Sequence, residues 1–206
     1  MKPIKKSGVF MLYSVLSIVF GATIILSLFW GGSFIYSLLA GKPMLTPDAF
    51  PVNIFMTNNH YLANHEGNVF LGDLSGQLLF LNPPIGLQIY SGLYTVIIWS
   101  VLSYIIFLMR KIIWTTMQGN PFIKDNGSRL RIIAILIINV PLVLNFMQSR
   151  IIYSLIQTIK IENVIITHSG NREMFYVFLG VGLFFLILSE VFRIGTSLKE
   201  ENELTV

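Results

Sequence analysis

The sequence predicts an all-α integral membrane protein with four transmembrane helices and a small extracytoplasmic antiparallel β cap. Only 12% of the residues are charged and 54% are hydrophobic, with a mean hydropathy of +0.71, whereas soluble domains are about 25% charged. The charges leave four uncharged stretches, at residues 7–41, 74–109, 132–149 and 174–189. Each approaches or exceeds the ~20 residues that cross a bilayer as a helix.

Positive charge is distributed unevenly among the segments that join these stretches. Ten Lys and Arg residues lie in the N-terminus, the central loop and the C-terminal tail, against four in the other segments. By the positive-inside rule, we expect a multi-pass protein of the bacterial inner membrane with both termini and the central loop cytoplasmic. Basic residues beside the membrane spans then account for the net charge of +4, and no direct binding of nucleic acid is expected.

The whole chain, residues 1–206, is expected to form a single four-span membrane domain. Its first span, residues 9–39, is longer than a bilayer requires, so it either tilts or leaves the membrane near Gly31 and Gly32 as a short external helix. Ser17 and Gly21 form a small-xxx-small pair that favours close approach of a neighbouring helix. The later spans are predicted at residues 85–109, 132–149 and 174–192.

Residues 42–84 are predicted to be an extracytoplasmic insertion that contains the β cap. The segments VNIFM, NVFLG and QLLFL are typical of short strands, and GDLSG supplies turn residues for a hairpin between the last two. NVIIT, after the third span, is a candidate additional strand. Pro83 and Pro84 end the last strand of the insertion, because proline has no N–H to donate.

The third span contains three residues with an expected structural role: Pro141, Asn139 and Asn145. Pro141 removes one backbone hydrogen bond and is expected to kink the helix. The two asparagine amides are expected to find partners on other helices, because unpaired amides are costly in hydrocarbon.

The central loop, residues 110–131, is basic, and its first part, RKIIWTTM, is a candidate extension of the second span. Asn120 followed by Pro121 suits a helix start or a turn. The segment DNGS then predicts a turn, with Ser128 capping the third helix. Arg129 and Arg131 are expected at anionic headgroups.

The cytoplasmic tail, residues 193–206, begins at Arg193, whose i, i+3 spacing from Glu190 in the fourth span suits an ion pair. Beyond it, Ile194, Leu198 and Leu204 form an apolar stripe on a short helix that docks on the central loop or on another protein. A solvated tail is the alternative.

The sequence offers little catalytic or metal-binding chemistry. The chain has no cysteine, which excludes thiol nucleophiles and disulfides. His60 and His65, with Glu66, are spaced unlike the zinc motif H-E-x-x-H. We therefore expect a non-enzymatic protein without catalytic, cofactor or metal sites. The uncharged stretches lack the intramembrane charges of ion-coupled carriers, which argues against a transporter. A small-molecule transporter, or a resistance or immunity membrane protein, is kept as the alternative because the third helix with its two asparagines offers a polar path.

Two segments, GNPFIKDNGSRLRIIA and ILSEVFRIGTSLKEENELTV, resemble the bacterial membrane family known as domain of unknown function 2975. The resemblance rests on a G-x-P-F…N…L-R pattern before the third span and an E-x-F-R-x-G-x-x-L-x-x-E-N-x-L-T pattern at the end. It implies a four-span helical protein. Because members are often encoded beside a very small helix-turn-helix regulator, it also implies a membrane-tethered regulatory pair.

Together these expectations predict a sensor or anchor that binds a small cytoplasmic regulator through the central loop and the tail. Its expected partners are the lipid bilayer and that regulator, with a homo-oligomer as a further alternative. The residues expected to bind the partner are Pro121, Phe122, Asn126, Arg129, Arg131, Glu190, Arg193, Gly195, Leu198, Glu201, Leu204 and Thr205.

Overall fold

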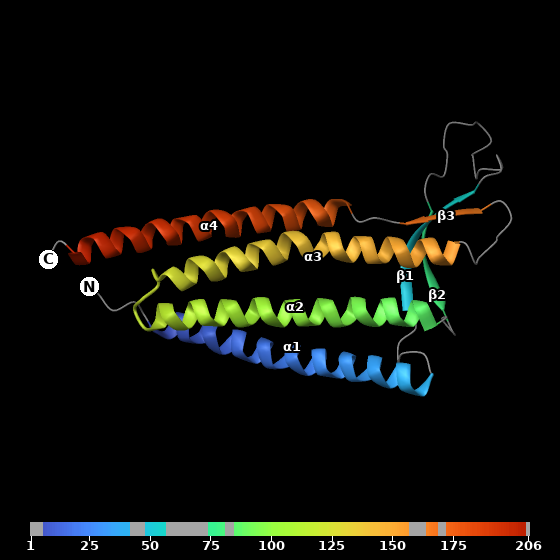
Figure 1. Ribbon diagram of the computed structural model, residues 1–206, viewed down its shortest axis with the longest axis horizontal. Helices are drawn as coiled ribbons and strands as arrows, with labels where there is room; N and C mark the ends of the chain where they lie inside the picture. The colour runs from blue at the N-terminus through green and yellow to red at the C-terminus, as the bar shows by residue number, and fades with distance from the viewer. Residues whose placement is uncertain are drawn as a thin grey trace. The chain divides into compact units, whose positions relative to one another are not determined.

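The computed structural model of the chain describes residues 6–41, 48–56, 74–80, 85–156, 164–168 and 172–204. Its helices are α1 (Lys6–Ala40), α2 (Ile85–Met117), α3 (Lys124–Ile156) and α4 (Arg172–Leu204) (Figure 1). Its strands are β1 (Asp48–Met56), β2 (Leu74–Phe80) and β3 (Val164–His168). All four helices are long and apolar enough to cross a membrane, which confirms the predicted number and order of spans.

Each helix extends beyond the span predicted for it. A helix of 33 residues, such as α2, α3 or α4, is about 50 Å long, whereas the hydrocarbon core is about 30 Å thick. The segment RKIIWTTM does extend α2, to Met117, and α1 continues through Gly31 and Gly32 to Ala40. An upright helix of this length is longer than the hydrocarbon core, and the charged residues of α2, α3 and α4 lie towards the helix ends.

The chain divides into two compact units. The first unit comprises Met1–Gly31, Thr95–Leu142 and Glu173–Val206, and the second comprises Gly32–Tyr94 and Val143–Arg172. In the first unit, the fully buried side chain of Ile133 and the buried Ala134 belong to α3. A Cβ added to Gly182 of α4 would lie 2.3 Å from Cγ1 of Ile138 and 3.2 Å from the Ala134 carbonyl oxygen. This glycine therefore allows α3 and α4 to approach closely.

In the first unit, Arg110 of α2 contacts two aromatic residues of α1. Its guanidinium donates a 3.3 Å hydrogen bond to the Tyr13 hydroxyl and lies 4.8 Å from the centre of the Phe20 ring. Tyr13 in turn contacts Trp114, with 5.5 Å between the ring centres. By contrast, a Cβ on Gly21 would meet nothing within 4 Å, so the Ser17–Gly21 pair does not serve packing within the described residues.

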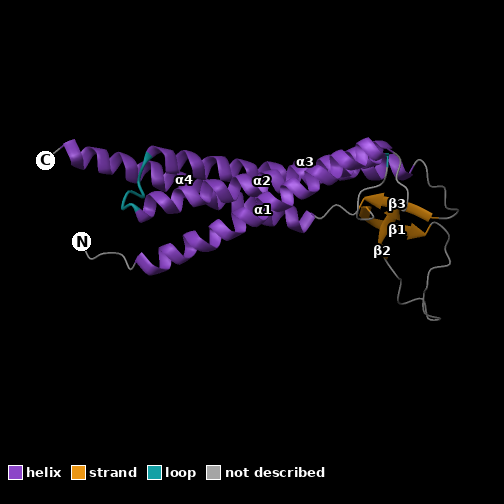
Figure 2. Ribbon diagram, turned by 90° about the horizontal axis from the view of Figure 1, so that it is seen from below, coloured by secondary structure: helices purple, strands orange, loops and turns teal. Residues whose placement is uncertain are grey.

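The second unit contains the three strands, which form one antiparallel sheet in the order β2-β1-β3 (Figure 2). In its helical part, a buried hydrogen bond of 3.1 Å joins Ser37 of α1 to Gln88 of α2. A Cβ on Gly92 of α2 would lie 2.0 Å from a ring carbon of Phe34. Glycine at this position lets the aromatic ring rest directly on the α2 backbone.

The strand register corrects part of the expected hairpin. Leu74, Ser75 and Gly76, which were predicted to form a turn, belong to β2, where Gly76 pairs with Val52 and Leu74 with Ile54. The reason is that β2 pairs with β1, which precedes it in the sequence. The strand predicted at NVFLG lies outside the described residues.

The start of α3 also differs from the expectation. Gly119 ends α2 with φ of +84°, a conformation that glycine adopts at helix C-termini without the Cβ penalty. The third helix then begins only at Lys124, so Pro121 lies in the loop. The predicted turn at DNGS is wrong, because these residues are helical and the Ile123 carbonyl accepts the first hydrogen bond, from the Asn126 N–H, at 3.0 Å.

Asn139 has a different partner from the one expected. Its amide nitrogen donates a 2.8 Å hydrogen bond to the carbonyl oxygen of Ile135, four residues earlier in α3. A short polar side chain can reach this carbonyl within its own helix, so no second helix is needed. Asn139 and Asn145 are both exposed, and α3 continues through Pro141 to Ile156.

Candidate interaction surface at the central loop and the tail

The loop between α2 and α3 is organised around the side chain of Asn126, which is fully buried. Its Nδ2 donates to the Thr115 hydroxyl at 2.7 Å and to the Pro121 carbonyl oxygen at 2.8 Å. Its Oδ1 accepts a hydrogen bond of 2.8 Å from Nη1 of Arg129. One amide therefore joins the end of α2, the loop and the first turns of α3.

Arg129 belongs to this network. Its side chain is only 17% exposed, and it adds a 3.1 Å ion pair to Asp125. Both of its contacts lie within the loop and the helix start, and its expected position at the headgroups stays a prediction. Arg131, two residues later, is exposed and forms no ion pair among the described residues.

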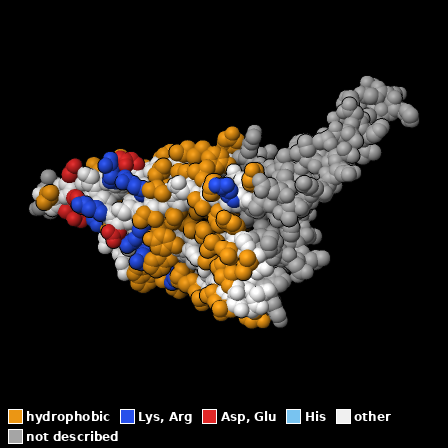
Figure 3. Space-filling model, turned by 45° about the vertical axis from the view of Figure 1, so that its right-hand side comes forward, with side chains coloured by type: hydrophobic (Ala, Val, Ile, Leu, Met, Phe, Trp, Pro, Cys, Tyr) orange, Lys and Arg blue, Asp and Glu red, His pale blue; other side chains and the backbone are white. Residues whose placement is uncertain are grey.

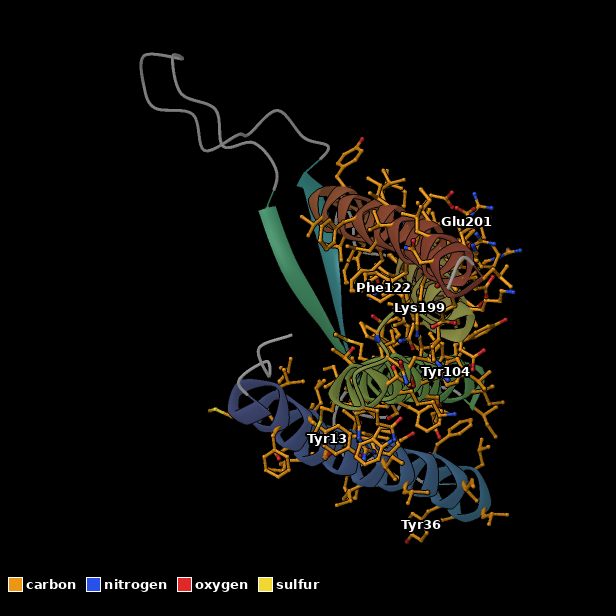
Figure 4. All side chains as sticks on the ribbon, turned by 90° about the vertical axis from the view of Figure 1, so that its left-hand side faces the viewer. Tyr13, Tyr36, Tyr104, Phe122, Lys199 and Glu201 are labelled. Carbon is orange, nitrogen blue, oxygen red and sulfur yellow. The ribbon has the colours of Figure 1, made fainter. Side chains whose placement is uncertain are left out.

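Aromatic packing joins the loop to the C-terminal half of α4. The rings of Phe122 and Phe192 lie with their centres 5.3 Å apart. A Cβ added to Gly195 would lie 2.6 Å from Cδ1 of Phe122, so the absent side chain makes room for the ring. Figure 4 shows Phe122, in the loop before α3, near Lys199 of α4, and Glu201 on the outer side of α4.

Polar contacts accompany this aromatic packing. The buried hydroxyl of Ser189 donates to the Gly127 carbonyl oxygen at 2.8 Å. Nearer to the end of α4, Lys199 donates to Oδ1 of Asn120 at 3.2 Å. The structure thus brings the basic loop and the acidic tail together, as their opposite charges predicted.

Two ion pairs at this surface are solvent-exposed. Lys124 and Glu200 lie 3.2 Å apart with side chains 78% and 52% exposed, and Arg193 pairs with Glu190, as their spacing predicted. Exposed ion pairs contribute about 0–1 kcal/mol each. The aromatic contact and the buried hydrogen bonds are therefore the main attachment of the loop to α4.

The apolar stripe predicted on the tail does not make this contact. Ile194 is 52% exposed, Leu198 55% and Leu204 87%, and the helix face that meets the loop carries Phe192 and Gly195 instead. Ile194 and Leu198 are four residues apart on one face of α4, away from the loop. Thr205, also predicted to bind a partner, lies outside the described residues.

Charged side chains gather at the end of the first unit where α4 ends, and hydrophobic side chains cover the middle of the helices, on the face drawn in Figure 3. A groove of about 270 Å³ at this end is lined by Phe122, Lys199, Glu200 and Glu203, among others. It offers an aromatic ring together with charges of both signs.

Sequence reasoning missed four residues at this surface: Thr115, Ser189, Thr196 and Lys199. Thr196 is buried beside the groove, and its hydroxyl donates a 2.8 Å hydrogen bond to the Phe192 carbonyl oxygen of its own helix. The available signal was periodicity, since Ser189, Thr196 and Lys199 follow one another at seven and three residues and so share one helix face. In the described part of the chain, no group of three His, Asp or Glu side chains lies close enough to hold a metal, and His60 and His65 fall outside it.

Comparison with known protein families gives a match over most of the C-terminal part of the chain. Residues 80–206, more than half of the chain, match the model of a family described as "Protein of unknown function (DUF2975)". This region includes α2, α3, the loop between them and α4. No curated protein and no solved structure matches the chain.

Proposed function

Because this chain belongs to the DUF2975 family of proteins of unknown function, we infer its function from its own residues. We propose that the protein is a non-enzymatic membrane anchor or sensor. The anchor binds a small cytoplasmic regulator through the central loop and the C-terminal half of α4. Four helices long and apolar enough to cross a membrane support the multi-pass membrane location.

The orientation in this proposal rests on charge. Ten of the fourteen Lys and Arg residues lie in the two terminal segments and the central loop, which favours a cytoplasmic position for all three in a bacterial inner membrane. The strands follow α1 and α3 in the chain, so the same topology places the sheet on the extracytoplasmic side. A signal outside the cell then has a route to the cytoplasmic surface through the helices.

One observation carries the proposal: α4 presents different residues on two faces. One face packs on the loop through Phe192 and Gly195, and the other leaves Ile194 and Leu198 exposed. These residues follow Arg193, beyond the uncharged stretch 174–189, so in the proposed topology they lie at the cytoplasmic headgroups or beyond them. Apolar residues exposed in this position are typical of a helix that binds a partner.

The proposal is tested by affinity purification after crosslinking in native membranes. We compare the full-length protein with an Ile194→Asp/Leu198→Asp variant and identify the co-purified cytoplasmic proteins by mass spectrometry. We expect a small helix-turn-helix protein, the partner that the family resemblance implies, to be enriched with the wild type and lost with this variant. Two carboxylates on the exposed face prevent burial against a partner but leave the contacts with the loop intact.

The matched control is Ile194→Val/Leu198→Met, which changes the same positions but keeps the surface apolar. It should retain the partner. Recovery of the same cytoplasmic proteins with the Asp variant as with the wild type would remove the binding role of this face.

A further inference from the structure

A second cavity of about 430 Å³ opens between the start of α3 and the C-terminal half of α4, within the first unit. Three cationic side chains line it, from Lys124, Arg131 and Arg193. The hydroxyl groups of Ser128 and Ser197 also line it, and neither has a hydrogen-bond partner among the described residues. The cavity therefore combines positive charge with two serine hydroxyl groups that are available to donate hydrogen bonds.

The balance of charge in this cavity is positive. Glu200 is the one acidic side chain in its lining, and it pairs with Lys124. Arg193 pairs with Glu190, which lies outside the lining, and Arg131 has no ion pair in the described structure. The N-terminus of α3 begins at Lys124, and its helix dipole adds further positive potential.

We propose that this cavity binds a phosphate ester, supplied either by the headgroup of an anionic phospholipid or by a soluble phosphate. Arginine side chains bind phosphate oxygens through paired, charge-assisted hydrogen bonds, and serine hydroxyls donate to the remaining oxygens. The volume falls within the ~300–1,000 Å³ typical of ligand pockets. It has room for a phosphate together with the group that it esterifies.

The position of the two arginines along the chain suits a headgroup. Arg131 directly precedes the uncharged stretch 132–149, and Arg193 follows the uncharged stretch 174–189. Both guanidinium groups therefore lie beside the hydrocarbon boundary, where phosphates of anionic lipids are found. A bound phosphate would bridge α3 to α4 and so stabilise the contact between the loop and the tail.

The test measures binding to purified full-length protein in a neutral detergent, without any protein partner. Water-soluble dihexanoyl phosphatidylglycerol is titrated and binding is followed by calorimetry, with dihexanoyl phosphatidylcholine and inorganic phosphate as the other probes. We expect Arg131→Gln and Ser128→Asp each to weaken phosphatidylglycerol binding about tenfold or more, because each removes or opposes a charge-assisted hydrogen bond. Lys111→Gln removes a charge outside the cavity and should change binding less than twofold.

Competition separates the two sources of phosphate. If inorganic phosphate at millimolar concentration does not displace phosphatidylglycerol, the cavity takes a lipid headgroup, and if it displaces the lipid, the cavity takes soluble phosphates. Wild-type affinity in both Arg131→Gln and Ser128→Asp would overturn the proposal, as would an equal effect of Lys111→Gln. Should Arg131→Gln fail to fold, Ser128→Asp decides, because Ser128 is exposed and makes no hydrogen bond that the substitution could remove.

Discussion

At the scale of single residues, Asn126 determines how the central loop is built. Its buried amide has three hydrogen-bond partners, which come from α2, the loop and α3. A buried amide stabilises a structure when all of its groups are paired, and its removal takes one hydrogen bond from each partner. The same side chain looks like an ordinary turn residue in the sequence DNGS.

We expect Asn126→Ala to destabilise the protein by more than about 2 kcal/mol, because up to three buried groups lose a partner. The measurement is the midpoint of thermal unfolding in detergent, followed by circular dichroism. Asn120→Ala is the control, since Asn120 is exposed and its side chain accepts one hydrogen bond, from Lys199. Equal midpoints for the two variants would show that the Asn126 network contributes little.

Asn139 is expected to behave in the opposite way. Its amide is exposed and donates to its own helix, so Asn139→Leu should change the unfolding midpoint by less than 2 °C or so and leave partner recovery intact. If Asn139→Leu instead abolished an export or resistance phenotype that accompanies expression, the transporter alternative would gain support.

At the scale of the elements, the loop and α4 meet through complementary shapes. The ring of Phe122 occupies the space that a side chain at position 195 would fill, next to Phe192. Shape complementarity of this kind depends on both partners together. A paired substitution at positions 122 and 195 can therefore test the contact.

Gly195→Val should displace the Phe122 ring and lower the free energy of unfolding by about 1–3 kcal/mol. Adding Phe122→Ala to Gly195→Val should recover part of this loss, because the smaller residue leaves room for the valine. A double-mutant cycle from denaturant unfolding measures the coupling between the two positions. Strictly additive effects would contradict the contact.

At the scale of the whole molecule, the absence of cysteine makes the predicted topology directly measurable. Ala40, at the end of α1, is expected outside the cell, and Asn120, between α2 and α3, is expected in the cytoplasm. Both residues are exposed. A single introduced thiol therefore reports the side of the membrane without background.

We expect a membrane-impermeant maleimide to label Ala40→Cys in intact cells, and Asn120→Cys only after permeabilisation. The physical reason is the surplus of Lys and Arg in the terminal segments and the loop, which keeps them on the cytoplasmic side. The reverse labelling pattern would invert the topology and place the loop and the tail outside.

The sequence by itself determined the four helices that are long and apolar enough to cross a membrane. Long uncharged stretches are visible along the chain, and such a stretch must form a helix in a bilayer because its backbone groups find no other hydrogen-bond partners. The sequence also predicted that the basic loop and the acidic tail would meet, and the pair Glu190–Arg193. Only the tertiary structure decided which residues make that contact. The start of α3 at Lys124, the inward role of Arg129 and the space above Gly195 depend on side chains of α2, α3 and α4 that are distant in the chain, and no local pattern specifies such packing.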